Sequence, residues 1–329
     1  MALRLVDVYT SADDSLADLD LEATVLDRRV LSLETGRLIR LLVEVEHTEG
    51  LLDALEKRLD GTDDTRFVVT EVTATLPRPP EPEEEEERPA DEEEKTTGRV
   101  SREEIYQDIA DAVDVGWVHY AFVVLSVVVA AGGMLRDEVA VVIGAMVIAP
   151  LIGPNIALAL GTTLADRSLL HRAGVVNALG LAVGLGLSVV LGLVLPVDAS
   201  LPEIASRTRI GFPDVILALA AGTAGALAMA RGVSTALVGV MVAVALVPPL
   251  VAVGLLAGGG QWGLAGRAGL LLTTNVVCVN LSAVATFLVQ GIRPTTWYEA
   301  QQARRSTRWA LALWTLALAV LAAAIWLAQ

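Results

Sequence analysis

Residues 142–155 read VIGAMVIAPLIGPN, and residues 237–250 read LVGVMVAVALVPPL. The second stretch follows the first at an offset of 95 residues, and the two share Gly, Met, Val, Leu and Pro in register. Without any gap, 17 of the 64 positions from Ala131 to Val194 carry the same residue as the position 95 further on. Methionine and proline are scarce in this region, so their matches indicate a duplicated apolar region. Such duplication is a frequent architecture of membrane transporters.

Seven apolar segments surround these stretches, each near or above the ~20 residues that span a bilayer. They cover residues 117–135, 139–163, 173–195, 212–230, 233–257, 268–290 and 309–328. The offset maps the first three onto the next three. We therefore predict an all-α polytopic membrane domain over residues 117–329, with repeat 1 at about 117–195, repeat 2 at about 212–290 and an extra segment at 309–328. Because three is odd, single crossings would give the repeats inverted topology; a re-entrant second or fifth segment would leave them parallel.

Prolines interrupt the second and fifth segments near mid-membrane. Proline removes a backbone donor and clashes with the carbonyl four residues earlier, so both helices should be broken there. Lipid cannot satisfy the freed backbone groups, which must face protein or water. Paired interruptions of this kind indicate the substrate site of repeat transporters, although a kinked helix without a ligand is the alternative. The predicted substrate or ion pathway comprises Pro150, Gly153, Pro154, Asn155, Asn177, Pro248, Pro249, Asn275 and Asn280.

The four asparagines allow two interpretations. An amide within an apolar segment needs a partner, and that partner is either a substrate or a neighbouring helix; we favour the helix contact. Arg172 and Arg267 open the third and sixth segments. We expect them to snorkel to the interface, with an electropositive vestibule as the functional alternative.

Several classes of function lack support in the sequence. No carboxylate falls in the middle of segments one to six, which disfavours a carboxylate-coupled cation antiporter. Cys278 is the only cysteine, and no Cys/His set, P-loop or nucleophile elbow is present, so we expect no metal, no cofactor and no catalytic residues. The net charge of −15 comes largely from residues 81–94, which hold ten acidic residues and one arginine. We therefore expect no nucleic-acid partner.

The first third of the chain differs in character. Residues 1–76 predict a cytosolic α+β domain: strands at 3–9, 38–45 and 67–75, a helix at 50–59, and a helix followed by a strand within 12–33. This order suggests a ferredoxin-like βαββαβ module. Residues 77–100 form an acidic segment whose composition predicts a disordered linker. Ser101-x-x-Glu104 is a capping box that opens an amphipathic juxtamembrane helix at 101–116.

The string from Val142 to Pro154 resembles the family called "domain of unknown function 389". Further matching features are Ser206-Arg207-Thr208, Val244 to Leu250, and Gly291-Ile292-Arg293-Pro294 through Trp297. The resemblance covers about Ser101 to Trp297. It implies a prokaryotic polytopic membrane protein with a small N-terminal α+β domain, and it implies no established activity or substrate.

The leading hypothesis is a membrane transporter or channel for a small solute. An anion is one option, because the N-termini of broken helices favour negative charge. The alternative is a membrane-anchored sensor or regulatory protein that uses its N-terminal domain. The partners that we expect are the lipid bilayer and further copies of the chain. Arginines in the loops favour a cell-membrane protein with a cytoplasmic N-terminus and an external C-terminus.

Overall fold

The computed structural model describes residues 3–10, 25–33, 36–59, 65–72, 75, 100–233 and 245–292. The chain divides into two compact units, Met1–Ile105 and Tyr106–Gln329. The acidic linker predicted at 77–100 falls almost entirely outside the described residues, and the seventh apolar segment, predicted at 309–328, lies wholly outside them.

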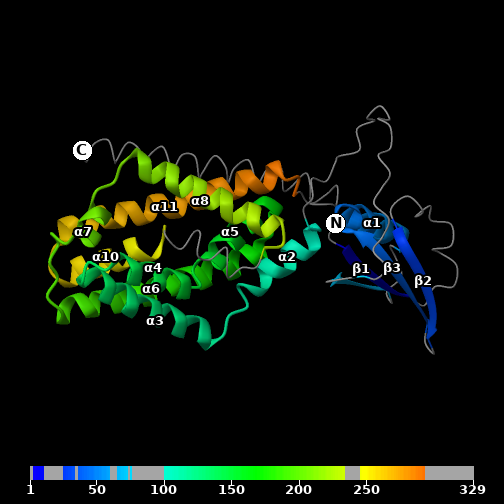
Figure 1. The fold of residues 1–329 in the computed structure, drawn as a ribbon, viewed down its shortest axis with the longest axis horizontal. Helices are drawn as coiled ribbons and strands as arrows, with labels where there is room; N and C mark the ends of the chain where they lie inside the picture. Colours follow the sequence, from blue (N-terminus) through cyan, green and yellow to red (C-terminus); the bar gives the residue numbers. More distant parts are fainter. Residues whose placement is uncertain are drawn as a thin grey trace. The chain divides into compact units, whose positions relative to one another are not determined.

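The first unit contains a four-stranded antiparallel sheet. Its strands are β1 (Leu3–Thr10), β2 (Val25–Leu33), β3 (Gly36–Glu44) and β4 (Arg66–Val72), in the order β2-β3-β1-β4. Helix α1 (Val45–Leu59) joins β3 to β4 and contacts β1 and β3 (Figure 1). The core lies between α1 and the sheet, where Val6, Leu41 and Leu55 are fully buried. The predicted strands and second helix of the βαββαβ module are present, while its first helix was predicted on residues that the structure does not describe.

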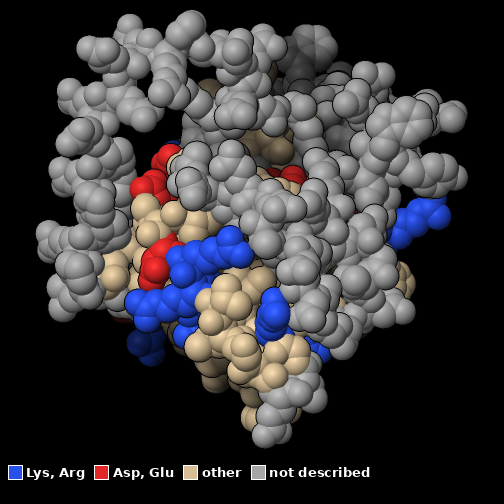
Figure 2. Space-filling model, turned by 90° about the vertical axis from the view of Figure 1, so that its right-hand side faces the viewer, with Lys and Arg blue, Asp and Glu red and all other residues tan. Residues whose placement is uncertain are grey.

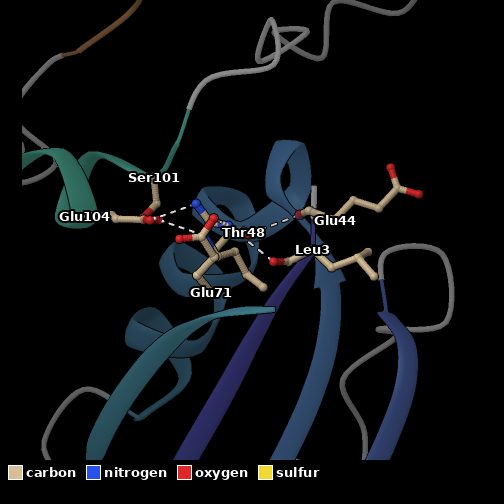
Figure 3. A network of polar contacts seen from close by, with 7 residues as sticks. Leu3, Glu44, Thr48, Glu71, Ser101 and Glu104 are labelled. Carbon is tan, nitrogen blue, oxygen red and sulfur yellow. Dashed lines mark hydrogen bonds and ion pairs between the residues drawn. The ribbon is translucent and has the colours of Figure 1, made fainter. Parts of the chain in front are cut away.

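A buried arginine of β1 pairs with an acidic residue in the first turn of helix α2 (Arg102–Asp111). The Arg4 side chain donates from Nη2 to Glu104 Oε1 at 2.8 Å and from Nε to Glu104 Oε2 at 3.1 Å, a bidentate arrangement that fixes both groups (Figure 3). Arg4 Nη1 also lies 3.2 Å from the carbonyl oxygen of Leu3. Glu104 is in the first turn of α2 (Arg102–Asp111), where its N–H donates to Ser101 Oγ at 3.3 Å. The predicted cap at Ser101 is therefore confirmed, whereas the helix predicted to reach residue 116 ends at Asp111.

Other arginines of the sheet also have acidic neighbours. Arg40 on β3 donates to both carboxylate oxygens of Asp7 on β1, at 2.8 and 2.7 Å, and this contact raises the pKa of Arg40. Arg29 pairs with Asp27 on β2 at 3.1 Å. Basic and acidic side chains lie next to each other on the face drawn in Figure 2. The pairs neutralise part of the positive charge of the sheet.

The second unit is helical. Its elements are α3 (Trp117–Leu135), α4 (Val139–Ile148), α5 (Ile152–Leu164), α6 (Arg167–Val194), α7 (Pro202–Ala205), the 3-10 helix η1 (Ser206–Thr208), α8 (Phe212–Ala230), α10 (Val247–Gly258) and α11 (Trp262–Val289). Helices α3, α6, α8 and α11 are long and apolar enough to cross a membrane, and a bent α4–α5 pair makes a fifth candidate span. Figure 1 shows these helices running alongside one another. The composition and length are typical of a membrane-spanning protein.

The helix bounds correspond closely to the apolar segments. Segments one and four coincide with α3 and α8, whereas α6 and α11 begin earlier than the third and sixth segments. The reason for the early start of α6 is local. Asp166 caps it by accepting hydrogen bonds from the N–H groups of Ser168 and Leu169, at 2.8 and 3.1 Å, so the polar residues that follow belong to the first turns.

Small residues bring α10 into direct contact with α6. A Cβ on Gly254 would overlap Ser188, and one on Gly192 would overlap the carbonyl oxygen of Leu255. A Cβ on Gly184 would lie 2.8 Å from Leu250 Cδ2. Small residues at every fourth position let two helices approach closely. Helix α6 therefore supports α10 along much of its length, and it also contacts α5.

Hydrogen bonds at the helix ends show which ends lie together. Tyr106, on α2, donates a hydrogen bond at 2.7 Å to Oδ2 of Asp166, which lies between α5 and α6. This bond raises the pKa of Tyr106. The N–H of Glu203, on α7, donates to Asp137 Oδ1 at 2.9 Å, between α3 and α4. Gln261, before α11, donates from Nε2 to the carbonyl oxygen of Val197, which follows α6, at 3.2 Å.

Candidate functional site

The first predicted helix break is present. Helix α4 ends at Ile148 and α5 begins at Ile152, with a bend of 54° between them. Ala149 has extended backbone, φ −73° and ψ 119°. Pro154 is the third residue of α5, where the missing N–H has no intrahelical acceptor to lose. Proline therefore starts a second helix here instead of kinking a continuous one.

The second proline pair has the same relation to its helix. Helix α10 begins at Val247, so Pro249 is its third residue, as Pro154 is of α5. Pro248 and Pro249 are buried. Residues 234–244, the first half of the predicted fifth segment, lie outside the described residues. Helices α5 and α10 thus both carry proline as their third residue.

Side chains from neighbouring helices satisfy carbonyl groups near the starts of both α5 and α10. Ser126 on α3 donates from Oγ to the carbonyl oxygen of Ala145, in the last turn of α4, at 2.7 Å. Asn275 on α11 donates from Nδ2 to the carbonyl oxygen of Ala245, also at 2.7 Å. Ala245 lies four residues before Pro249, which has no N–H to offer it. Ser126 is not among the residues predicted from the sequence, although a hydroxyl inside an apolar segment was the available signal.

Three asparagines from three helices meet beside the first break. Asn155 on α5 accepts hydrogen bonds at Oδ1 from Asn177 on α6 and from Asn280 on α11, both at 3.1 Å. Asn155 Nδ2 donates to the carbonyl oxygen of Leu151 at 2.9 Å and lies 3.4 Å from Asn177 Oδ1. The exposed fractions of the three residues are 1%, 5% and 0%. We call Asn155, Asn177 and Asn280 the asparagine cluster; it joins helices that are up to 125 residues apart in sequence.

Two amide oxygens of α11 are buried without a partner. Asn280 Nδ2 donates to Asn155 and to the carbonyl oxygen of Val276, at 3.1 and 2.9 Å, while its Oδ1 has no hydrogen bond. Asn275 Oδ1 is unpartnered in the same way. The orientation of each amide follows from its neighbours, because the carbonyls of Val276 and Ala245 can only accept. Each oxygen is therefore available to a hydrogen-bond donor.

The remaining predicted site residues are not members of this cluster. Arg172 and Arg267 are exposed near the starts of α6 and α11. Pro150 is partly exposed in the break itself, and a Cβ on Gly153 would lie 2.9 Å from the Cβ of Ala112. The structure thus brings together three of the four predicted asparagines, while the fourth, Asn275, contacts Ala245, just before the start of α10.

The arrangement is one of neutral amides. Among the described residues, no group of three or more His, Cys, Asp or Glu could hold a metal ion. Amides can donate and accept hydrogen bonds but carry no charge to transfer or neutralise. The hydrogen bonds of these amides join α5, α6 and α11.

Comparison with known proteins agrees with the sequence motifs. The family described as "Domain of unknown function (DUF389)" matches residues 146–281, which include both proline-bearing helix starts and all four asparagines. An uncharacterised protein of Methanocaldococcus jannaschii is 38% identical over 283 residues, which is 86% of this chain and 85% of that protein. No solved structure gives a significant match. The chain belongs to the family of domain of unknown function 389.

Proposed function

We propose that this protein is a membrane transporter or channel for a small solute, and not an enzyme. The observation that carries the proposal is the pair of helix starts with proline at the third position, both buried and both packed on α6. Interrupted helices of this kind are tolerated inside a membrane domain only where protein or a water-filled cavity surrounds them. The unpartnered amide oxygens of Asn275 and Asn280 add buried acceptors to that region.

An internal repeat supports the proposal. Helices α3 and α8 have the same length, with both bounds offset by 95 residues, and so do α6 and α11. Helices α5 and α10 start at the same offset. The corresponding contacts also agree, since α6 contacts both α5 and α10, and α11 likewise contacts both. Repeats arranged in this way form the substrate pathway of many secondary transporters.

The hydrogen bonds at the helix ends support inverted topology. The Tyr106–Asp166 contact joins the residues before α3 to the turn between α5 and α6. At the opposite ends of α3 and α6, Asp137 meets Glu203, and Val197 meets Gln261 before α11. We infer that α3, the first helix of repeat 1, starts at one end of the helical unit, and that α8, the first helix of repeat 2, starts at the opposite end. The two sets of three segments would then have opposite orientations in the membrane.

The test is flux into proteoliposomes that hold the full chain. We expect the wild type to move at least one probe of a panel of water, urea, glycerol, nitrate and thallous ion faster than protein-free vesicles. Pro154→Leu and Pro249→Leu should reduce that flux. Pro202→Leu is the matched control, because Pro202 is an exposed residue at the start of α7. Flux that is absent in the wild type, or unchanged in both variants, would count against the proposal.

The surface of the helices supports a lipid partner and association between copies. Large apolar side chains are exposed on α6 and α8, among them Val194, Phe212 and Leu217 at 76%, 71% and 67%. Apolar area of this kind is expected to face lipid or another protein. We propose a multi-pass, homo-oligomeric cell-membrane protein with a cytoplasmic N-terminus. Crosslinking in membranes measures the assembly, and protease accessibility of the N-terminal domain measures its side.

The alternative is a membrane-anchored sensor that uses the N-terminal domain. It draws on one feature of the first unit, the bidentate Arg4–Glu104 pair, which holds the beginning of α2. Helix α2 continues in the chain into the second unit. Deleting residues 1–96 separates the two functions: a transporter would still move its solute, whereas a sensor would lose its readout.

A further inference from the structure

We infer that the solute of this pathway is electrically neutral and carries N–H or O–H donors, a substrate class whose assignment rests on the proposed function. The sequence alone left an anion as one option, on the strength of helix N-termini. The unpartnered groups, the placement of charge and the prolines each favour a neutral donor instead.

The unpartnered groups beside the helix starts are acceptors. Asn280 has both amide hydrogens bound, by Asn155 Oδ1 and by the carbonyl of Val276, so only its Oδ1 remains. Asn275 has its Nδ2 on the carbonyl of Ala245 and its Oδ1 free. Both residues are more than nine-tenths buried, at 0% and 6% exposed. A buried acceptor without a partner is costly, and a solute that donates a hydrogen bond would relieve that cost.

The placement of charge argues against an ion. Helices α3, α4, α5 and α10 contain no Asp, Glu, Lys or Arg. Arg172 and Arg267 are exposed near the starts of α6 and α11. An ion that leaves water for a region without a counter-charge pays a large desolvation penalty, whereas a neutral solute does not. A cation would also meet the positive ends of α5 and α10.

The prolines argue specifically against an anion. Helix N-termini bind anions through free backbone N–H groups. Pro154 removes one of these groups from the first turn of α5, and Pro248 and Pro249 remove two from that of α10. Arg207 is a further buried donor, with its Nε unpartnered. Its Nη2 lies 3.5 Å from Glu203 Oε2, so a carboxylate already accompanies its charge.

The experiment compares probes on the full chain in vesicles of phosphatidylcholine and phosphatidylglycerol. Stopped-flow light scattering measures urea and glycerol entry, and fluorescence quenching measures nitrate and thallous ion entry. We expect the wild type to raise urea or glycerol permeability at least tenfold above protein-free vesicles. Nitrate and thallous ion should stay within twofold of the protein-free rate.

Two variants test the role of the amide oxygen. Asn280→Leu should lower the neutral flux at least threefold. Thr286→Val should leave it unchanged, because Thr286, also buried on α11, donates only to the carbonyl of Ser282 within its own helix. Elution as a single species from a sizing column checks that each variant folds.

Each outcome has one meaning. Nitrate or thallous ion entry as fast as that of the neutral probes would overturn the inference while leaving transport intact. Entry of no probe above the protein-free rate would sink both the inference and the proposed function. Unchanged neutral flux in a folded Asn280→Leu would remove the assignment to its amide oxygen. If Asn280→Leu does not fold, the selectivity of the wild type decides the inference.

Discussion

Replacing Asn275 by leucine tests whether a side chain from α11 substitutes for the donor that Pro249 lacks. Asn275 Nδ2 lies 2.7 Å from the carbonyl oxygen of Ala245, which is 8% exposed. Leaving a buried carbonyl without this donor costs about 1–3 kcal/mol. Leucine also removes the unpartnered Oδ1 of Asn275, which offsets part of the loss. We expect a net destabilisation of about 1–2 kcal/mol, or roughly 2–8 °C in the thermal midpoint for a unit of this size.

A double-mutant cycle isolates the contact. Pro249→Ala returns an N–H four residues after Ala245, so the carbonyl gains a second donor. In that background, Asn275→Leu should cost about 1 kcal/mol less than in the wild type. The midpoint of thermal unfolding in detergent micelles is the measurement. Thr274→Val is the control, because its hydroxyl donates to the carbonyl of Leu270 within the same helix. An equal cost of Asn275→Leu in both backgrounds would refute the substitution of one donor by the other.

Three further changes have defined outcomes. Gly254→Ala should lower the thermal midpoint, because the new Cβ would overlap Ser188. Gly186→Ala should not, because a Cβ at that position would meet open space. Equal midpoints of the two variants would contradict the close packing of α10 on α6. Arg4→Met should destabilise the first unit by about 1–3 kcal/mol, because it leaves Glu104 unpaired. Arg29→Met, which removes an exposed pair, should cost less than about 0.5 kcal/mol. Both free energies of unfolding are measured by denaturant unfolding followed by circular dichroism. The bond to Asp166 raises the pKa of Tyr106, so the bond stabilises the fold below pH ~10 and is lost as the pH rises through the raised pKa. Tyr106→Phe lacks this bond and should therefore lose less stability than the wild type when thermal scans are repeated at alkaline pH. Parallel curves of thermal midpoint against pH would contradict this.

The correspondence between sequence and structure is closest where local chemistry decides. Helices α3 and α8 have the bounds that the apolar segments predicted, and the break before α5 falls at residues 149–151, which include Pro150. Hydropathy placed the starts of α6 and α11 too late. It averages over a window, whereas a single capping residue such as Asp166 sets where a helix begins.

The partners of the asparagines required the tertiary structure. Asn275 and Asn280 are five residues apart, so they point about 140° apart on a helix and contact different neighbours. One supplies a donor near Pro249, and the other joins Asn155 and Asn177. Periodicity places each amide on a face of its own helix but does not state which helix that face meets. The packing of α11 against α5 and α10 decides it.

The sequence by itself determined the apolar helices, the proline-bearing starts of α5 and α10 and a small α+β domain. These features arise from hydrophobic runs, backbone donors and alternation, which are properties of neighbouring residues. Only the tertiary structure decided that three amides share hydrogen bonds while two amide oxygens remain unpartnered. Hydrogen-bond satisfaction depends on atoms from helices distant in the chain, and it becomes definite once those helices have packed.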